Sequence, residues 1–268
     1  MAASGGDVSG PWEGYWQVVY DSGAEEIVEF RNTTTAVRPA LGFSVFAGGH
    51  FLELRSTASR TPPAGWPPTR EEAIAMLRDF SAVAGRSSWR EDGSRWVSES
   101  KVSMAGDPRL EGTIVRHVLE VEGETARCER SIERAGAVPE TWRRLSGAGD
   151  TPLAGAWQSG DPDDLWMYLV TQGHYGVIRT SSAQPRTPAN GDEFSDDEMF
   201  ALWEGFGANA GARLETGGSF DHWPMLGQVA GYEIRKHETF RLITVEDDRF
   251  VAVLPPYEDA DEGWRRIG

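Results

Sequence analysis

The sequence predicts a mainly β protein that consists of two tandem antiparallel β-barrels, each with one short helix. Three observations lead to this fold class. The chain of 268 residues repeats its landmarks once, most of each copy reads as short β-prone runs between turn residues, and each copy contains a single helical pattern. Many evenly spaced antiparallel strands with one helix are typical of a small closed barrel of about eight strands.

The repeat is visible in the order of three motifs. Gly-Tyr-Trp at 14–16 matches Gly-Ala-Trp at 155–157, GHFLELRS (49–56) matches GHYGVIRT (173–180), and each copy closes on Trp-Arg-Arg, at 142–144 and 264–266. The second and third motifs recur at nearly the same spacing, which indicates duplication. The first motif recurs at a longer spacing, so the first copy has about 17 extra residues before its Gly-His. We expect domains at 1–148 and 149–268, joined around the small, polar segment SGAGDTP (146–152).

The strands are predicted from turn residues between β-prone runs. SSWREDGSRWVSES (87–100) reads as a hairpin about Asp92-Gly93, because Asp-Gly between such runs favours a tight turn. The segment 111–131 turns near Glu122-Gly123, and the segment 231–255 turns at Asp247-Asp248. VVYDSGAEEIVEF (18–30) has apolar runs on both sides of a glycine.

One helix is predicted in each copy, over 69–86 and 195–213. Thr69 with Glu72, and Ser195 with Glu198, have the spacing of an N-terminal capping box. Apolar residues follow at helical spacing, and Gly85 and Gly211 are the expected helix ends. We expect each helix to pack on its sheet as a structural plug.

Composition and charge exclude several functions. The formal net charge is −16, so a phosphate backbone finds no basic surface, and we expect no nucleic-acid partner. The single cysteine, Cys128, permits neither an internal disulfide nor a cysteine-based zinc site. No apolar run has the length of a membrane-spanning helix, and the first residues lack the pattern of a secretory signal. We therefore expect a cytoplasmic protein without a membrane partner, and the sequence allows a homodimer.

These motifs, in this order, resemble the bacterial lipocalin-like domains of the calycin superfamily. The resemblance rests on the Gly-x-Trp first strand, the Gly-His-aromatic strand, the mid-chain helix and the final Trp-Arg-Arg strand, and it covers about 120 residues of each copy. It implies a barrel that binds a small, largely apolar molecule. Tandem proteins of this kind include cofactor-independent cyclases, hydratases and isomerases of natural-product pathways. In such barrels an arginine of the last strand packs over the first-strand tryptophan, which here implies Arg143 or Arg144 over Trp16, and Arg265 or Arg266 over Trp157.

His117 is the first candidate for acid/base chemistry. It alternates with apolar residues along 113–121, so it belongs to the more apolar, inward face of its strand. Alignment of the copies through Arg116 and Arg241 places Leu242 at the equivalent position. A histidine where the sister copy has leucine is hard to explain by packing alone, although a satisfied core histidine is the alternative. An imidazole can move protons near neutral pH.

Several other residues are candidates for the same site. His50 is the second catalytic candidate, with Glu53 and Tyr15 as polar partners. His50 and His174 occupy equivalent positions, which favours a structural hydrogen bond at a barrel rim over a proton-transfer role. Trp89 and Trp96 flank the predicted hairpin and could stack a flat ligand. Arg55 and His174 complete the expected ligand-binding set.

Other chemistries find little support. Asp221-His222 would form a dyad only in a turn, since neighbouring strand residues point to opposite faces, and His237 shares a polar face. No spacing demands a metal site, and no nucleophile elbow, phosphate loop or dinucleotide fingerprint is present, so neither a metal nor a cofactor is expected.

The sequence favours a cofactor-independent enzyme of the cyclase, isomerase or hydratase type, acting on a hydrophobic small molecule by acid/base chemistry. The alternative is a non-catalytic carrier of an apolar ligand, distinguished by the polarity of its cavity. A third interpretation has one inert copy, with the first copy active because it holds His117.

Overall fold

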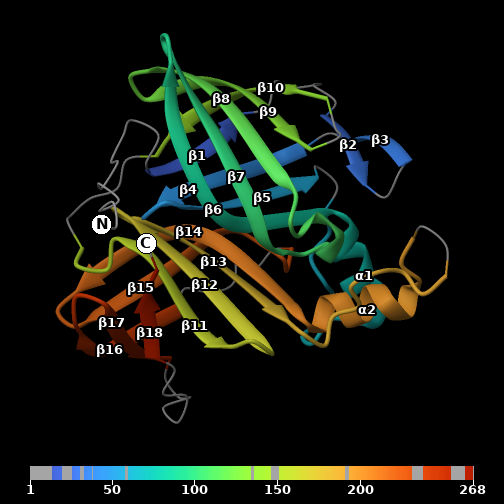
Figure 1. Ribbon diagram of the computed structural model, residues 1–268. Coiled ribbons are helices and arrows are strands. Elements are labelled where there is room, and N and C mark those ends of the chain that lie inside the picture. Colours follow the sequence, from blue (N-terminus) through green and yellow to red (C-terminus); the bar gives the residue numbers. More distant parts are fainter. Residues whose placement is uncertain are drawn as a thin grey trace, which may run out of the picture.

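Two closed antiparallel barrels lie one above the other in the computed structural model (Figure 1). The structure describes residues 14–19, 26–30, 33–37, 39–57, 60–133, 136–145, 151–190, 193–230, 238–254 and 263–267. Barrel 1 comprises β1 (Gly14–Val19), β4 (Pro39–Ala47), β5 (His50–Thr57), β6 (Phe80–Asp92), β7 (Arg95–Ala105), β8 (Ile114–Glu122), β9 (Thr125–Ile132) and β10 (Val138–Arg144). Barrel 2 comprises β11 (Gly155–Asp161), β12 (Asp164–Thr171), β13 (His174–Ser181), β14 (Phe206–Thr216), β15 (Ser219–Gly227), β16 (Glu238–Val245), β17 (Arg249–Val253) and β18 (Gly263–Arg266). The predicted fold class is confirmed.

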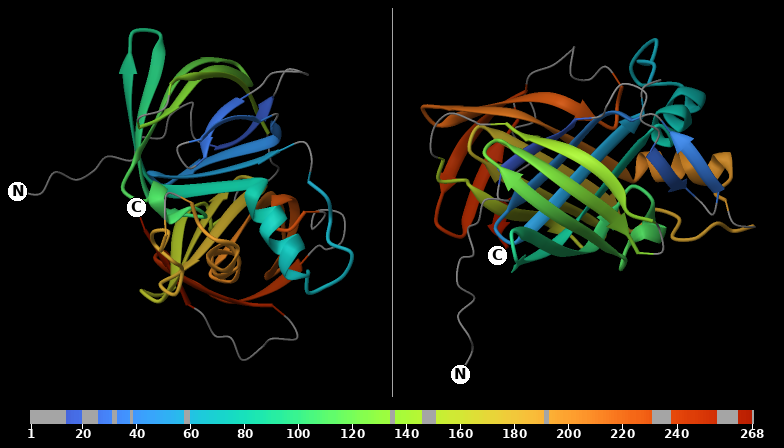
Figure 2. Two further views of the ribbon diagram at one scale, coloured as in Figure 1. Left: turned by 90° about the vertical axis from the view of Figure 1, so that its right-hand side faces the viewer. Right: turned by 90° about the horizontal axis from the view of Figure 1, so that it is seen from above.

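The extra residues of the first copy contribute a hairpin outside the barrel. β2 (Glu26–Phe30) and β3 (Thr33–Val37) follow β1 and precede β4 in the chain. They pair only with each other and form a separate two-stranded sheet. This hairpin lies at the end of barrel 1 that also carries the helices (Figure 2). The insertion therefore adds to one rim and leaves the eight-stranded order of the barrel unchanged.

The helices are shorter than predicted. α1 (Arg70–Arg78) and α2 (Asp196–Glu204) begin at the predicted capping boxes, where Thr69 and Ser195 each accept a hydrogen bond from the backbone of the glutamate three residues on. Each helix ends a full turn or more before the expected glycine, and β6 and β14 start almost at once. The prediction was wrong because the apolar residues that follow fit helical and strand spacing equally well.

Gly85 and Gly211 are strand residues at equivalent irregularities of the two barrels. The register of β6 with β7 shifts at Ala84/Gly85, and that of β14 with β15 shifts at Ala210/Gly211. A Cβ atom on Gly85 would lie 2.0 Å from the Lys101 carbonyl oxygen, and one on Gly211 would lie 2.1 Å from the Trp223 carbonyl oxygen. Glycine is therefore required by the close approach of two strands at a bulge.

Each barrel is closed by an arginine on a tryptophan. The Arg144 guanidinium lies 5.9 Å from the ring centre of Trp16, and that of Arg266 lies 4.2 Å from the ring centre of Trp157. Each such cation–π contact contributes about 0.5–2 kcal/mol. The structure confirms these two of the expected pairings.

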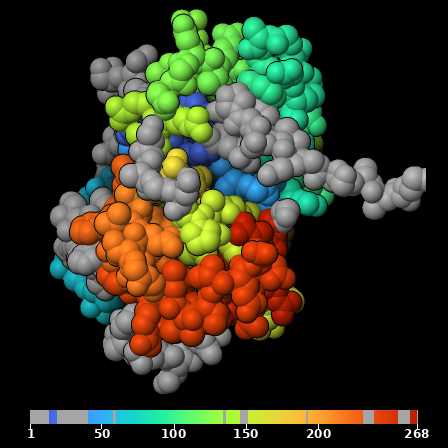
Figure 3. Space-filling view, turned by 90° about the vertical axis from the view of Figure 1, so that its left-hand side faces the viewer, coloured from blue at the N-terminus to red at the C-terminus, as the bar shows by residue number. Residues whose placement is uncertain are grey.

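The largest apolar cluster lies between the barrels rather than inside either one. Strands β4, β5 and β6 of barrel 1 face strands β12, β13 and β14 of barrel 2, and side chains from both interdigitate. At the centre, the absent side chain of Gly176 leaves room for Leu52, since a Cβ there would lie 2.5 Å from a Leu52 methyl group. Figure 3 shows the two halves of the chain as separate layers of one molecule.

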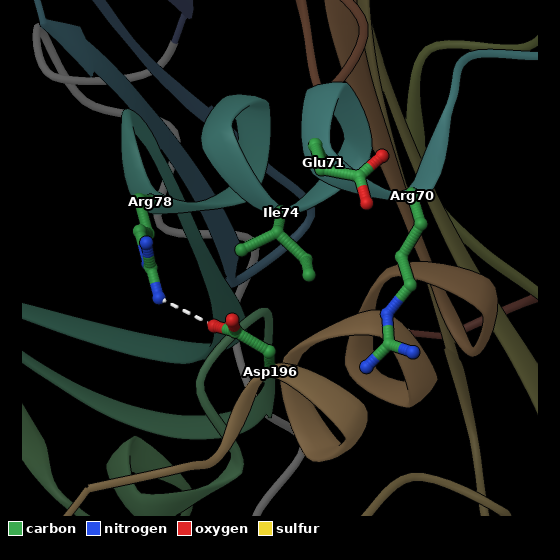
Figure 4. A pocket seen from close by; sticks show the side chains of 5 residues that line it. All are labelled: Arg70, Glu71, Ile74, Arg78 and Asp196. Carbon is green, nitrogen blue, oxygen red and sulfur yellow. Dashed lines mark hydrogen bonds and ion pairs between the residues drawn. The ribbon is translucent and has the colours of Figure 1, made fainter.

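The helices continue this contact at one end. α1 and α2 lie side by side, and Arg78 of α1 forms an ion pair of 2.8 Å with Asp196 of α2 (Figure 4). Arg70 and Asp197 form a second pair across the same seam. Neither described helix has the length and apolarity needed to cross a bilayer.

Candidate functional site

The interior of barrel 1 contains a buried network of charged side chains. Along β5, Phe51, Glu53 and Arg55 share the inward face, because alternate residues of a strand point to the same side. Glu53 is 1% exposed, which is unusual for a carboxylate unless other groups pair with it. Those partners come from β8 and β9, on another side of the same barrel.

His117 is fully buried at the centre of this network. Its Nε2 contacts Glu53 Oε1, and its Nδ1 lies 2.8 Å from the hydroxyl oxygen of Ser98. Ser98 is the cross-strand neighbour of His117 in the pairing of β7 with β8. Serine, imidazole and carboxylate thus form one continuous line of hydrogen bonds. Of the partners predicted for His117, the structure brings Glu53 to it.

The network extends from Glu53 toward the helix end of the barrel. Arg130 Nε donates to Glu53 Oε2 at 2.8 Å, and Arg55 lies 3.8 Å from the same oxygen. Arg55 also pairs with Glu140 at 3.3 Å, and Trp142 donates its indole N–H to Glu140 at 2.6 Å. Two arginines and two glutamates balance each other, so the barrel holds these charges without a net excess.

Electrostatics set the protonation of Glu53. Burial raises the pKa of Glu53, but the attraction of Arg130, His117 and Arg55 outweighs it and holds the pKa well below its usual range. An ionised carboxylate only accepts hydrogen bonds, so the proton between the two side chains belongs to His117 Nε2. A ring with its single proton on Nε2 has a lone pair on Nδ1 that can accept the Ser98 hydroxyl proton. The Glu53 carboxylate therefore holds a proton at Nε2.

Aromatic side chains surround the His117 ring. The ring centres of Trp142, Phe46 and Trp89 lie 5.3, 5.8 and 6.4 Å from that of His117. Trp96 packs against the same apolar cluster of barrel 1. The histidine thus has aromatic neighbours as well as charged partners, and Trp89, predicted as a ligand-binding residue, is one of these neighbours.

Exposure rises along the network. Ser98 and His117 are fully buried, whereas Arg55 and Arg130 are each 8% exposed and Glu140 is 7% exposed. The more exposed residues lie nearer the rim that carries α1, since Arg55 and Ser81 are partners at the start of β6. The Arg55 and Arg130 side chains are therefore slightly exposed, whereas the side chains of Glu53 and Glu140 are buried.

Three predicted site residues lie elsewhere. Tyr15 is buried between the barrels and stacks on His174, with ring centres 4.6 Å apart. His50 and His174 occupy equivalent positions at the starts of β5 and β13, and each bonds through Nδ1 to the carbonyl oxygen two residues earlier, Gly48 or Gln172. Burial lowers the pKa of both rings. None of the three reaches the His117 network.

The equivalent positions in barrel 2 are apolar. Counted along the ladders from the bulges at Gly85 and Gly211, Ser98 and His117 correspond to the paired residues Phe220 and Phe240. Glu53 corresponds in the same way to Val177. The expected counterpart, Leu242, was wrong by two residues, because alignment through single arginines does not detect the strand register. The copy-specific character of His117 remains.

Barrel 2 has its own buried histidine, whose burial the sequence analysis did not predict. His222 lies inside β15, with Nε2 2.8 Å from the Tyr168 hydroxyl and its ring stacked on Tyr175 at 3.7 Å between centres. Burial, reinforced by Arg213, lowers its pKa well below the usual range. Asp221 bonds to Thr239 on the other face, so no Asp-His dyad forms. The alternation of Phe220, His222 and Pro224 was the available signal, whereas His237 lies outside the described residues.

Other sites are less developed. No three His, Cys, Asp or Glu side chains of the described ranges are placed to hold a metal ion. A cavity of about 250 Å³ lies in the seam between α1 and α2, lined by Arg70, Glu71, Ile74, Arg78 and Asp196 (Figure 4). It is open and mostly polar, and it does not include the barrel residues described above.

Comparisons with known proteins identify no family for the chain. No protein-family model matches it, and no curated protein matches its sequence. Among solved structures, it is similar to the crystal structure of the uncharacterized protein YLR301w from Saccharomyces cerevisiae, with 12% sequence identity and a TM-score of 0.47 over 95% of this chain and 97% of that chain. The barrels and the His117 network therefore define the candidate site of this protein.

Proposed function

We propose that barrel 1 is the site of cofactor-independent acid/base catalysis on a small, largely apolar molecule, with His117 as the group that moves the proton. The observation that carries this proposal is the hydrogen-bonded line from Ser98 through His117 to Glu53. A general base oriented by a carboxylate is the arrangement that proton-transfer enzymes use.

The roles follow from the positions of the protons. Glu53 accepts a hydrogen bond from Nε2–H and fixes the ring, while Nδ1 faces the Ser98 hydroxyl and can accept its proton. Ser98 relays the proton: its hydroxyl gives its proton to Nδ1 as the oxygen takes one from the substrate. His117 becomes an imidazolium, which the Glu53 carboxylate stabilises, and the proton returns by the same route to another atom of the substrate. Isomerisation, dehydration and cyclisation each need such a transfer.

The surroundings indicate how a substrate would be held. Phe46, Trp89 and Trp142 provide aromatic surface for an apolar body. Arg55, Arg130 and Glu140 provide the polar side of the lining, and a polar group of the substrate would face them. A substrate with an apolar body and one polar group suits both halves of this lining.

Metabolite turnover tests the proposal directly. The purified protein is incubated with a small-molecule extract of its host, and mass spectrometry identifies the compounds that are consumed and formed. We expect the wild-type protein to convert at least one compound. His117→Gln and Ser98→Ala should slow that conversion by about 10²–10⁴-fold, the usual contribution of a positioned acid or base.

His222→Gln is the matched control, because it alters the buried histidine of the other barrel. It should retain wild-type turnover, and circular dichroism should show that all three variants fold. Conversion that survives in both His117→Gln and Ser98→Ala would overturn the proposal. So would a compound that co-purifies with the protein and is never converted, which would support the carrier alternative.

A further inference from the structure

Arg213 is a buried cation inside barrel 2 whose hydrogen-bonding capacity is half used. Its side chain is 2% exposed, and its Nη1 donates to Glu215 at 3.0 Å and to Thr151 at 3.2 Å. Its Nε and Nη2 are also buried, yet they have no hydrogen-bond partner in the structure described. Buried donors without partners are rare in folded proteins, and each one needs an explanation.

The two open donors form one edge of the guanidinium. Nε and Nη2 point the same way and can donate two parallel bonds to the two oxygens of a carboxylate. Two other arginines of this chain use that edge. Arg109 binds Asp107 through Nε at 2.9 Å and Nη2 at 2.6 Å, and Arg179 binds Asp164 at 2.6 and 3.2 Å. At Arg213 no carboxylate occupies this edge, and the Tyr168 hydroxyl is a polar group that interacts with the guanidinium.

The fold itself does not require a cation here. Arg213 pairs across the ladder with His222, and the equivalent pair in barrel 1 is Ser87 with Ser100, whose hydroxyls bond to each other at 2.9 Å. Barrel 1 therefore closes with two small, mutually satisfied residues at these positions. A large charged residue in the second copy indicates a function beyond closure.

We propose that barrel 2 binds a small monocarboxylate through the Nε and Nη2 edge of Arg213. The Phe220 ring covers one face of the guanidinium, 4.4 Å from its carbon, which directs binding to the edge. Tyr168, whose hydroxyl bonds to His222, lies beside Arg213 and would be a polar neighbour of a carboxylate bound there. The apolar cluster of Tyr175, Phe220 and Phe250 suits an aromatic or aliphatic body.

One negative charge fits this site better than two. Arg213 is the only cation described next to Tyr168 and His222, and Glu215 already balances part of its charge. His222 is held neutral by burial, so it adds no further positive charge. A carboxylate satisfies both open donors, whereas a phosphate dianion would bring a second, unbalanced charge into the barrel.

Titration with benzoate and hexanoate tests the site. Inorganic phosphate and the neutral benzyl alcohol are the comparison probes. Binding is measured by calorimetry and by the ¹⁵N–¹H resonance of Arg213 Nε in the wild-type protein. We expect a carboxylate to bind and to shift that resonance. Arg213→Gln and Arg213→Lys should weaken binding by about tenfold or more, because a charge-assisted bidentate pair is lost.

Arg179→Gln is the matched control. It removes an arginine of the same barrel whose edge is already filled by Asp164, so it should bind the probes as the wild type does. The proposal is overturned if neither carboxylate binds, which would leave ordered water as the partner of Arg213. It is also overturned if Arg213→Gln binds unchanged, or if phosphate binds as tightly as the carboxylates. If Arg213→Gln fails to fold, the Lys variant and the wild-type resonance decide the question.

Discussion

The buried imidazole of His222 should make the stability of this protein depend on pH. Burial lowers its pKa well below 6.5, the ordinary value, so the folded state favours the neutral ring. The unfolded chain binds a proton below pH 6.5. Between that value and the lower folded pKa, the unfolded state therefore holds more protons, and stability falls as the pH falls.

The size of the effect follows from linkage. A group that titrates at 6.5 when unfolded and far lower when folded costs about 1.4 kcal/mol between pH 7.5 and 5.5. The comparison is between the wild-type protein and His222→Gln, which keeps a polar side chain at the position but does not titrate. His50 and His174 are present in both proteins, so their contributions to the pH dependence of the unfolding free energy cancel in the comparison.

The assay is urea unfolding of both proteins at pH 7.5, 6.5 and 5.5. The difference in unfolding free energy between the wild-type protein and His222→Gln should shift by about 1.4 kcal/mol in favour of the variant as the pH falls from 7.5 to 5.5. In parallel, the His222 ring resonances should not titrate down to pH 5.5. A gap that stays constant with pH, or a ring that titrates near 6.5, would show that the imidazole is not held neutral and would refute the reasoning.

Three further predictions concern other buried positions. Glu53→Gln should lower the unfolding free energy by about 3–5 kcal/mol in urea titrations, because Arg130 would lose its buried counter-charge; a cost under 1 kcal/mol would mean that the network is solvated. Gly85→Ala should cost about 1–3 kcal/mol or more by the same measurement, while Gly65→Ala, with open space around it, should change stability by less than about 0.5 kcal/mol. Cys128 is buried with a raised pKa, so iodoacetamide should label it only as fast as the protein unfolds; rapid labelling of the folded protein would contradict its burial.

Much of the architecture could be predicted from the sequence because it depends on local rules. The Asp92-Gly93 turn and the two capping boxes are each encoded by a few neighbouring residues, whereas the tryptophan–arginine closures were implied by the resemblance to lipocalin-like domains. The helix ends could not be predicted in this way. Phe80, Ala82 and Ala84 alternate as a strand, yet Phe80 also continues the apolar stripe of the helix.

The candidate site was partly predictable for the same reason. Alternation placed His117 on the inward face of its strand, and the choice of Glu53 as a partner matches the contact in the structure. Arg130 and Glu140 were missed because only the closed barrel brings β9 and β10 to the centre. The counterpart of His117 depended on the strand register, which bulges control. His222 was considered only as half of a dyad with Asp221, which strand alternation argues against, so its burial among aromatic side chains was not predicted.

The contact between Leu52 and Gly176 has a consequence for how the chain folds and how it arose. These residues occupy equivalent positions of the repeat, and they meet where the two barrels join. The chain is thus a covalently linked pseudo-dimer, in which the surface that would join two identical subunits is buried within one polypeptide. An excised barrel would expose that apolar face to water. The two copies should therefore fold cooperatively, and each half alone should aggregate or pair with another copy of itself.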